Sequence, residues 1–498
     1  MWRPLLLIGV APISVLSATL DLTAQNHTCD LIDSRRVNSI TREDRRISHV
    51  SSPRFFCTDG TQIEADSSIT FEATSFTQFF GNVHIRDGIQ ELLAERAQYS
   101  SRTRHLQAQG LVSITDSENG STITGDNLVM IKSRDDNTPN DMTIHGGRPR
   151  ALLFSSTGST PETTQPEPFD INANVIRLLG DHLFQARGSV EIQRNTLIAY
   201  SDSMEYQQKI GTLTLFKKAR IISPDLESGD TLDVRGDTIH MLLPKDDIDE
   251  LEARGYAHLI TDDVDIKGPV LRVFFAQKEL ERIVSMLAEN NQETERKLLH
   301  NLDTTNDNTF IIPQAKTEDF TLSGDSITVN NPNGEIETVS AIGKARGVSN
   351  ARNSLNTDET PHIIRHDWIE GDTVTAIFNK NSNNVQELPP LIENDAPQGY
   401  TIDKLIAQGD ARSFYRSDPN SNSVSENSEQ CLEFNYVLGE EIRIFMKNGE
   451  VDHMEVKKAK GAYFQIQDNP VTSETDTTSS LFSDAISTCP EIRYPIEK

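Results

Sequence analysis

The sequence predicts an all-β chain built from about ten bent hairpins, and three of its features lead to this fold class. An eight-residue pattern recurs along the chain: apolar, any, small, acidic, any, apolar, any, apolar. A second strip, with strict alternation of apolar and polar residues, follows many copies of this pattern. A period of two is that of a strand with one buried face. Polar stretches rich in turn-forming residues separate the strips, so the repeat predicts antiparallel hairpins stacked along one axis.

The first strip predicts a strand with a bend in its middle. Its clearest copies begin at Ile123, Val234, Leu322 and Ile369, and weaker copies begin at Ile63, Leu92, Ile171, Ala199, Ile266 and Val437. In the first of these, Ile123 and Gly125 are two residues apart, whereas Gly125 and Leu128 are three apart. One extra residue in an alternating strand indicates a β-bulge or a sharp bend. The small residue and the acidic residue after it suit a tight corner, so we place the bend there.

The second strip predicts a return strand whose alternate side chains face the interior. It is clearest in Leu106, Ala108, Gly110, Val112 and Ile114, and copies begin at Phe184, Leu251, Val339 and Leu405. The phase of the two strips predicts inward-facing side chains at Leu106, Ala108, Val112, Ile123, Leu128, Met130, Phe184, Val190, Ile239 and Leu251. The mixture of Ala and Gly with large side chains has two interpretations. It leaves a cleft between two facing sheets, or it only lets the sheets pack closely.

The composition excludes two classes of protein. Lys and Arg number 47 and Asp and Glu number 75, so the formal net charge is −28. Such a chain repels a polyanion, so we expect no nucleic-acid partner. After residue 25 no stretch approaches the ~18 consecutive apolar residues of a membrane helix, which excludes a helical integral membrane protein. Apolar residues make up 36 % of the chain, which suits thin, two-layered β structure better than one thick core.

The N-terminus and the cysteines predict an exported protein. Residues 1–24 are expected to be a signal peptide, because a single early arginine precedes an apolar run at 5–20 that is short for a membrane span. An even number of cysteines in an exported chain permits disulfides, and this chain has Cys29, Cys57, Cys431 and Cys489. Three sets of pairings are possible, of which Cys29–Cys57 with Cys431–Cys489 is the local one. Four free thiols are the alternative.

Composition divides the rest of the chain into segments. A basic N-terminal arm at 25–59 is marked by Arg35, Arg36, Arg42, Arg45, Arg46 and Arg54. We expect this arm to be solvated and poorly ordered; the alternative is a contact for lipid phosphate or an acidic partner. The other segments are a repeat block at 60–154, a linker at 155–168, a second block at 169–287, a polar insertion at 288–318, a third block at 319–467 and a tail at 468–498. Helix is expected only near 277–300.

One block of the repeat resembles a known family. Its motifs are Phe-Phe-Gly-Asn-Val-His-Ile at 79–85, Glu-Leu-Leu-Ala-Glu-Arg-Ala-Gln-Tyr at 91–99, Leu-Gln-Ala-Gln-Gly-Leu-Val at 106–112, Ile-Thr-Gly-Asp at 123–126 and Gly-Gly-Arg-Pro-Arg at 146–150. In this order they resemble the OstA-like family, which includes the periplasmic lipopolysaccharide-transport protein LptA and the N-terminal domain of the outer-membrane protein LptD. The resemblance is close over about residues 60–155 and looser to about 467. It implies a repetitive antiparallel β-jellyroll with two facing sheets that open as a V.

The resemblance also implies a function without chemistry. In the family, lipid A acyl chains lie between the two sheets, and terminal strands pair edge to edge with other proteins of this fold. We therefore expect a non-enzymatic protein of the periplasm, associated with the outer membrane or free of it, that helps carry lipopolysaccharide or another multi-acyl lipid to that membrane. The lipid groove is expected to be lined by Leu92, Ala94, Leu106, Ala108, Val112, Ile123, Leu128, Met130, Phe184, Val190, Ile239 and Leu251. The chain departs from the family in being much longer than one LptA-like module.

No enzyme signature accompanies the repeat. The chain contains no G-x-S-x-G, H-E-x-x-H, Walker or Rossmann glycine pattern, and its 12 histidines have no ligand spacing. We therefore expect no catalytic residue, no metal and no cofactor. The acidic runs at 246–250 and 262–265 lack the spacing of a calcium loop and are expected to be solvated turns. Two other classes stay open: a structural or adhesive β-repeat surface protein, and a secreted β-solenoid enzyme that acts on polysaccharide.

Overall fold

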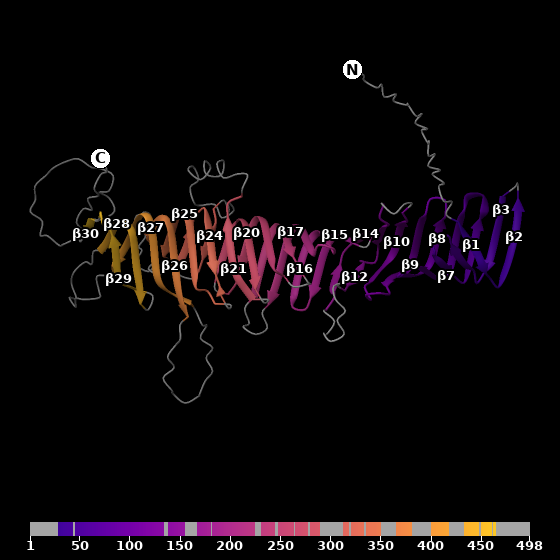
Figure 1. Cartoon of the computed structure of the whole chain (residues 1–498), viewed down its shortest axis with the longest axis horizontal. Helices are drawn as coiled ribbons and strands as arrows, with labels where there is room; N and C mark the ends of the chain where they lie inside the picture. The colour runs from indigo at the N-terminus through magenta and orange to yellow at the C-terminus, as the bar shows by residue number, and fades with distance from the viewer. Residues whose placement is uncertain are drawn as a thin grey trace, which may run out of the picture.

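The structure is a computed structural model that describes residues 28–42, 45–133, 138–154, 167–180, 182–224, 231–244, 248–262, 264–276, 279–288, 312–317, 320–332, 335–349, 365–380, 400–417, 433–447, 450–460 and 462–464. These residues contain no α-helix and a short 3-10 turn, η1 (Glu72–Thr74). The strands follow one another along a single long axis, with the N-terminal strands at one end and the C-terminal strands at the other (Figure 1). Over the same residues, no helix has the length and hydropathy to cross a bilayer.

The described residues form thirty strands joined in one sheet. Their bounds are β1 (Cys29–Asp33), β2 (Arg36–Arg42), β3 (Arg45–Ser51), β4 (Arg54–Cys57), β5 (Gln62–Glu64), β6 (Ser67–Phe71), β7 (Phe76–Asp87), β8 (Gln90–Ser100), β9 (His105–Asp116), β10 (Thr122–Ile131), β11 (Asp141–His145), β12 (Arg150–Leu153), β13 (Phe169–Asn172), β14 (Val175–Leu179), β15 (Leu183–Arg194), β16 (Leu197–Gln207), β17 (Thr212–Pro224), β18 (Thr231–Leu242), β19 (Glu250–Ile260), β20 (Asp265–Ala276), β21 (Glu279–Met286), β22 (Gln314–Lys316), β23 (Phe320–Ser323), β24 (Ser326–Asn330), β25 (Thr338–Ser349), β26 (Asp367–Lys380), β27 (Tyr400–Ser417), β28 (Glu433–Lys447), β29 (Glu450–Lys457) and β30 (Ala462–Phe464). The pairings between these strands are antiparallel, which confirms the predicted all-β antiparallel class. Some rungs are split into two short strands; β11 and β12, for example, both pair with β10.

The ladders between long strands shift register near their middle, where the sequence predicts a bend. Between β10 and β9, Gly125 pairs with Val112 and Asn127 pairs with Gln109, so β9 holds one residue more than β10 across the shift. The extra residue lies beside Gly110, whose φ is +79°. We expected it in the first strip, on β10, and that part of the prediction is wrong. The second-strip strands β15, β19, β25 and β27 likewise hold one residue more than their partners across the register shift.

The acidic residue next to the bend explains why the extra residue lies on the neighbouring strand. A Cβ atom added to Gly110 would lie 2.4 Å from a carboxylate oxygen of Glu95 on β8, so only glycine leaves room for that side chain. The same contact recurs between Asp237 and Gly255, between Asp325 and Gly343, and between Asp372 and Gly409. At each of these corners an acidic side chain, in a strand or, for Asp325, between β23 and β24, packs on a positive-φ glycine of the next strand.

Substituting the corner glycine is expected to destabilise the fold. Gly110→Ala should cost roughly 1–3 kcal/mol, because alanine is strained at this φ and its Cβ would collide with Glu95. Gly60→Ala is the matched control: its φ is +88°, but no atom lies within 4 Å of the added Cβ. The midpoint of thermal unfolding should fall further for Gly110→Ala than for the control. Equal shifts in the two variants would contradict the role given to the acid–glycine contact.

A continuous apolar core runs through the described molecule. It extends from Phe55 near the N-terminal end to Ile444 near the C-terminal end. Strand β10 contributes Ile123, Leu128 and Met130, which are 4 %, 1 % and 4 % exposed. The wider spacing between the first two of these residues marks the bend. The side chains of β10 that the sequence predicts to face the interior are therefore the ones that are buried.

The basic segment at 25–59 does not form the poorly ordered arm that we expected. From Cys29 onward it forms β1–β4, and β3 and β4 pair with β6 and β5 of the first repeat block. Val50 and Phe55 are buried in the core, whereas Arg45 and Arg54 on the same strands are exposed. These two arginines therefore lie on the outer face of an ordered sheet. The buried residues of the same strands, Val50 and Phe55, pack that sheet against the core.

Two more segments differ from the expected organisation. Residues 279–286, where a helix was expected, form β21, because this segment pairs with β20 on one side and β24 on the other. The polar insertion at 288–318 contains β22, which pairs with β20. The second and third repeat blocks therefore share one sheet. The signal peptide at 1–24, residues 155–166 of the linker, residues 289–300 of the expected helix and the tail at 468–498 lie outside the described residues.

Candidate functional site

Residues from opposite ends of the same bent strand meet in one place in the interior. Leu92 and Tyr99 are seven residues apart on β8, which is ~23 Å along a straight strand. Both nevertheless line one small hollow near the N-terminal end of the molecule. Leu106 and Ile114, on β9, line the same hollow. The bends in β8 and β9 therefore bring the two halves of each strand to a shared apolar space.

This hollow contains only part of the predicted lipid groove. It is small: the volume that the centre of a water-sized sphere can reach is about 20 Å³. Three of the predicted groove residues line it, namely Leu92, Leu106 and Met130. The others are buried in the continuous core outside this lining, and they are Ala94, Ala108, Val112, Ile123, Leu128, Phe184, Val190, Ile239 and Leu251. The interior is thus a layer filled mainly by side chains, with a small open space near its N-terminal end.

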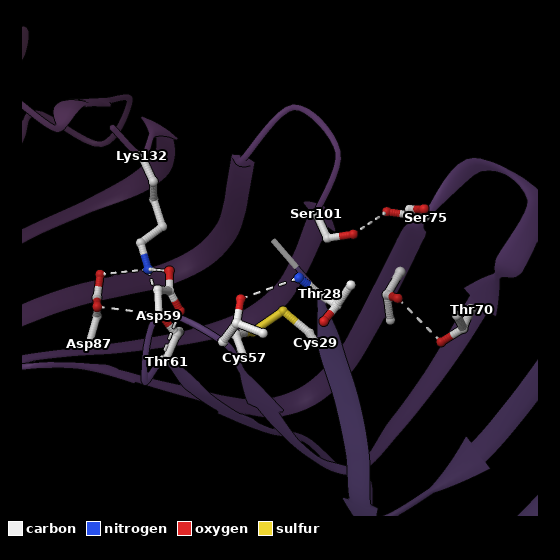
Figure 2. Close-up of a disulfide and its surroundings, with 12 residues drawn as sticks. Thr28, Cys29, Cys57, Asp59, Thr61, Thr70, Ser75, Asp87, Ser101 and Lys132 are labelled. Carbon is white, nitrogen blue, oxygen red and sulfur yellow. Dashed lines mark hydrogen bonds and ion pairs between the residues drawn. A yellow bond between two sulfur atoms is a disulfide. The ribbon is translucent and has the colours of Figure 1, made fainter. Parts of the chain in front are cut away.

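A buried lysine lies at the rim of the hollow. The Nζ atom of Lys132 is 2.7 Å from Oδ2 of Asp59 and 2.9 Å from Oδ2 of Asp87, and the lysine side chain is 9 % exposed. Figure 2 shows this lysine reaching both carboxylates from a separate segment of the chain. Burial raises the pKa of Asp59, but hydrogen bonds from Lys132 and Thr61 and the lysine charge outweigh burial and hold it well below its usual range. Burial, reinforced by the charge of Asp59, raises the pKa of Tyr99 in the same hollow.

These three charged residues were not among the predicted site residues. A sequence signal exists for two of them. Lys132 continues the inward alternation two residues after Met130, and Asp87 continues it two residues after Ile85. A charged residue in phase with a buried apolar strip indicates an ion pair or a site. Asp59 lies in a turn between β4 and β5, where no periodicity identifies it.

A disulfide joins the N-terminal strand to the wall beside the lysine cluster. Cys29 of β1 and Cys57 of β4 are register partners and are bonded. Figure 2 shows the bond beside Asp59 and Thr61. This confirms one of the local pairings that the sequence left open. The other two cysteines, Cys431 and Cys489, lie outside the described residues.

A second hollow lies near the C-terminal end. The volume that the centre of a water-sized sphere can reach in it is about 50 Å³, and its wall includes the aromatic rings of Phe320, Trp368 and Phe414. Asp367 lines it as well and accepts hydrogen bonds from Arg416 through the backbone N at 3.1 Å and Nε at 2.9 Å. The Arg416 side chain is fully buried. Both ends of the molecule thus combine an apolar hollow with a buried ion pair.

Both ends of the sheet also have unpaired edges, within the part of the chain that the structure describes. Strand β2 pairs only with β3, and β1 pairs only with β4. At the other end, β29 and β30 pair only with β28. The N-terminal edge strands expose four large apolar side chains, Leu31, Ile32, Val37 and Ile40. Unpaired edges of this kind are templates for strand addition.

An ion cluster on the outer face gives a pH-dependent prediction. The Nη2 atoms of Arg220 and Arg235 lie 2.8 Å and 2.5 Å from Oδ2 of Asp233. Burial raises the pKa of Asp233, but the hydrogen bonds and charges of the two arginines outweigh it and lower the pKa to about 2. Because the folded pKa lies below the unfolded value, this carboxylate stabilises the fold above about pH 4, and the contribution is lost as the pH falls through 2.

Asp233→Asn is therefore expected to lower the free energy of unfolding by roughly 2 kcal/mol at pH 7 and by much less at pH 2. Thermal unfolding of the variant and the parent at both pH values measures the difference. A loss of the same size at pH 2 would show that Asp233 stabilises the fold by some means other than its charge.

Comparisons with known proteins leave the family open. No protein-family model matches the chain. No curated protein matches it significantly either. The likeness to OstA-like proteins therefore rests on the motifs between residues 79 and 150 and on their repetition. Within the described residues, no group of three or more His, Cys, Asp or Glu side chains is placed to hold a metal ion.

Proposed function

We propose that the chain is a non-enzymatic lipid-binding protein of the periplasm, free or associated with the outer membrane, that helps carry lipopolysaccharide or another multi-acyl lipid to that membrane. The observation that carries this proposal is the apolar core that continues along the strands from Phe55 to Ile444. The OstA-like motifs and the expected signal peptide support it. The disulfide between Cys29 and Cys57 agrees with an oxidising compartment.

We further infer that the bent strands form an open β-jellyroll with the cross-section of a V. The bends make the closed side of the V, and the strand ends make the open side. The position of the N-terminal hollow supports this arrangement, because Gln90 and Lys132, at strand ends, line it together with core residues. Acyl chains lie between the two layers in this proposal, and the sugars stay outside the opening.

The physical basis of binding is apolar burial. Each CH₂ group removed from water contributes ~0.8 kcal/mol, so several acyl chains can hold a lipid firmly without any salt bridge. The net charge of −28 disfavours a binding mode based on lipid phosphates. The acyl chains therefore provide the affinity and the head group remains in solvent.

The partner that we propose for the ends of the sheet is another OstA-like β-jellyroll protein, bound by edge-strand pairing. Two features support this. The edges of β1 and β2 are unpaired, and exposed Val37 and Ile40 on β2 offer apolar contacts to an added strand. Arg36 and Arg45, exposed on β2 and β3, would favour an acidic edge on the partner.

Mass spectrometry of lipids that co-purify with the protein from a periplasm tests the proposal. We expect a lipid with several acyl chains, present in near-stoichiometric amount and absent from an unrelated periplasmic protein purified in parallel. Recovery of no lipid would favour the competing class, a structural or adhesive protein whose interior is filled by its own side chains. The β-solenoid alternative has less support, because solenoid coils stack as parallel strands, whereas the described strands pair antiparallel.

A further inference from the structure

The cluster of Lys132, Asp59 and Asp87 joins two strand ends and a turn. Lys132 directly follows β10, Asp87 is the last residue of β7, and Asp59 lies in the turn between β4 and β5. The lysine is 73 residues from Asp59 in sequence, and its Nζ also donates a hydrogen bond to Thr61 Oγ1. The contact therefore spans two parts of the wall that are far apart along the chain (Figure 2).

The wall that carries Asp59 is held firmly. The backbone N–H of Cys57 donates to the carbonyl of Thr61 at 2.8 Å, and that of Gly60 donates to the carbonyl of Cys57 at 2.9 Å. The carboxylate of Asp59 accepts the backbone N–H of Thr61 at 3.1 Å. The disulfide to Cys29 then ties this turn to β1. The carboxylate side of the contact is thus pre-organised, and the lysine docks onto it.

The contact lies over the N-terminal hollow. The rim residues Thr61, Asp87 and Lys132 line that hollow together with the apolar side chains of Leu92 and Leu106. The two carboxylates keep some access to water, since the side chains of Asp59 and Asp87 are 27 % and 25 % exposed. The ion pairs of Lys132 thus lie beside apolar side chains of the hollow. If the lysine and the carboxylates separate, water can solvate each of them.

The choice of charged residues here has a physical consequence. An apolar closure at this rim would avoid the desolvation cost of three charged groups. It would, however, expose apolar surface whenever the wall parted. A charged closure separates into two hydrated surfaces, so it can open and close without unfolding the strands beneath it.

We propose that Lys132, Asp59 and Asp87 form a gate over the N-terminal hollow. The gate is closed in this structure, and its opening lets an acyl chain pass sideways between solvent and the apolar interior. This inference rests on the proposed lipid-binding function. It adds to that function the place where the ligand is admitted and the side chains that control its rate of passage.

Uptake kinetics of a fluorescent fatty acid test the gate in the full-length protein. The variant is Lys132→Met, which removes the cation, and the matched control is Lys457→Met, which removes an exposed ion pair with Glu441 at the other end of the sheet. With cis-parinaric acid in stopped flow, we expect Lys132→Met to raise the rates of uptake and release together by ~10-fold or more. The control should stay close to the parent. Because a gate acts on both directions of passage, the equilibrium Kd should change far less than either rate.

Crosslinking tests the effect of holding the gate closed, whereas Lys132→Met tests the effect of opening it. The crosslinking test does not depend on the stability of Lys132→Met. In a Cys431→Ser/Cys489→Ser background, Lys132→Cys and Asp87→Cys are joined by a short bis-maleimide. The unreacted double variant lacks the cation, so we expect it to take up the probe as fast as Lys132→Met does, and we expect crosslinking to slow its uptake by ~10-fold or more.

The outcomes separate the gate from the proposed function. Unchanged rates in the folded Lys132→Met variant and in the crosslinked protein, with normal Kd, would overturn the gate and leave lipid binding intact. A parent protein that takes up no fatty acid would overturn lipid binding and the gate with it. A change in Kd with no parallel change in the two rates would assign Lys132 a purely structural role and would also overturn the gate.

Discussion

Replacing Leu128 with aspartate is expected to abolish lipid binding and to lower the free energy of unfolding by roughly 3–5 kcal/mol. Leu128 is 1 % exposed and pairs with Ala108 and Ile144 on the strands beside it. Because these ladder partners are apolar and give a carboxylate no counter-charge, the new side chain must be protonated or force the wall open to water. Either response removes the apolar surface that the proposed ligand needs.

Thr124→Asp is the matched control for Leu128→Asp. Thr124 lies on the same strand, β10, but is exposed on the outer face. Chemical unfolding and equilibrium titration with a fluorescent fatty acid measure both variants. We expect the control to behave as the parent in both experiments. Normal binding by a folded Leu128→Asp variant would contradict a lipid site in the apolar interior around this residue.

The second large effect is expected on removing the Cys29–Cys57 disulfide with the Cys29→Ser/Cys57→Ser variant. The bond closes a loop with a sequence separation of 28, and the chain-entropy relation gives roughly 3–4 kcal/mol for a loop of that size. β1 depends on the bond more than other strands do, because it pairs only with β4 among the described strands and most of its side chains are exposed. We therefore expect β1 to lose its protection.

Hydrogen exchange measured on peptides from β1 and β9 separates a local effect from a global one. Exchange should become fast in β1 and stay slow in β9, which is paired with β8 on one side and β10 on the other. Slow exchange of β1 in the variant would show that the strand does not depend on the disulfide and would contradict this prediction.

The sequence was most informative where one physical rule decides the outcome. Alternation predicts which side chains of β10 are buried, since a slip of one residue would place Leu128 and Met130 in water. The same alternation predicts the buried face of β9. The small residue followed by an acidic residue in the first strip predicted where the strand bends. It did not predict where the extra residue lies. That residue is beside Gly110 on the neighbouring strand, because the side chain of Glu95 needs space there. Such a cross-strand contact is not visible in the period of either strand.

The predictions that rested on residue composition, and not on the alternation of apolar and polar residues, were wrong for two segments. The six arginines at 35–54 suggested a solvated arm, yet Val50 and Phe55 between and beside them are buried in strands. The polar residues near 277–300 suggested a helix, yet residues 279–286 add a strand to an existing sheet. The rim cluster was missed because Lys132 gains its partners from turns and strand ends 45 and 73 residues away. Long-range ion pairs of this kind depend on the fold and not on local spacing.

Photo-crosslinking from the interior tests the central claim most directly. A photo-reactive amino acid is placed at Leu106, which lines the N-terminal hollow, and the protein is irradiated with lipopolysaccharide present. The same amino acid at Gln109, exposed on the outer face of β9, is the control. The proposed function predicts a lipopolysaccharide adduct at Leu106 and none at Gln109. No adduct at Leu106, and none at the neighbouring inward positions Leu92 and Met130, would contradict a lipid-carrying interior.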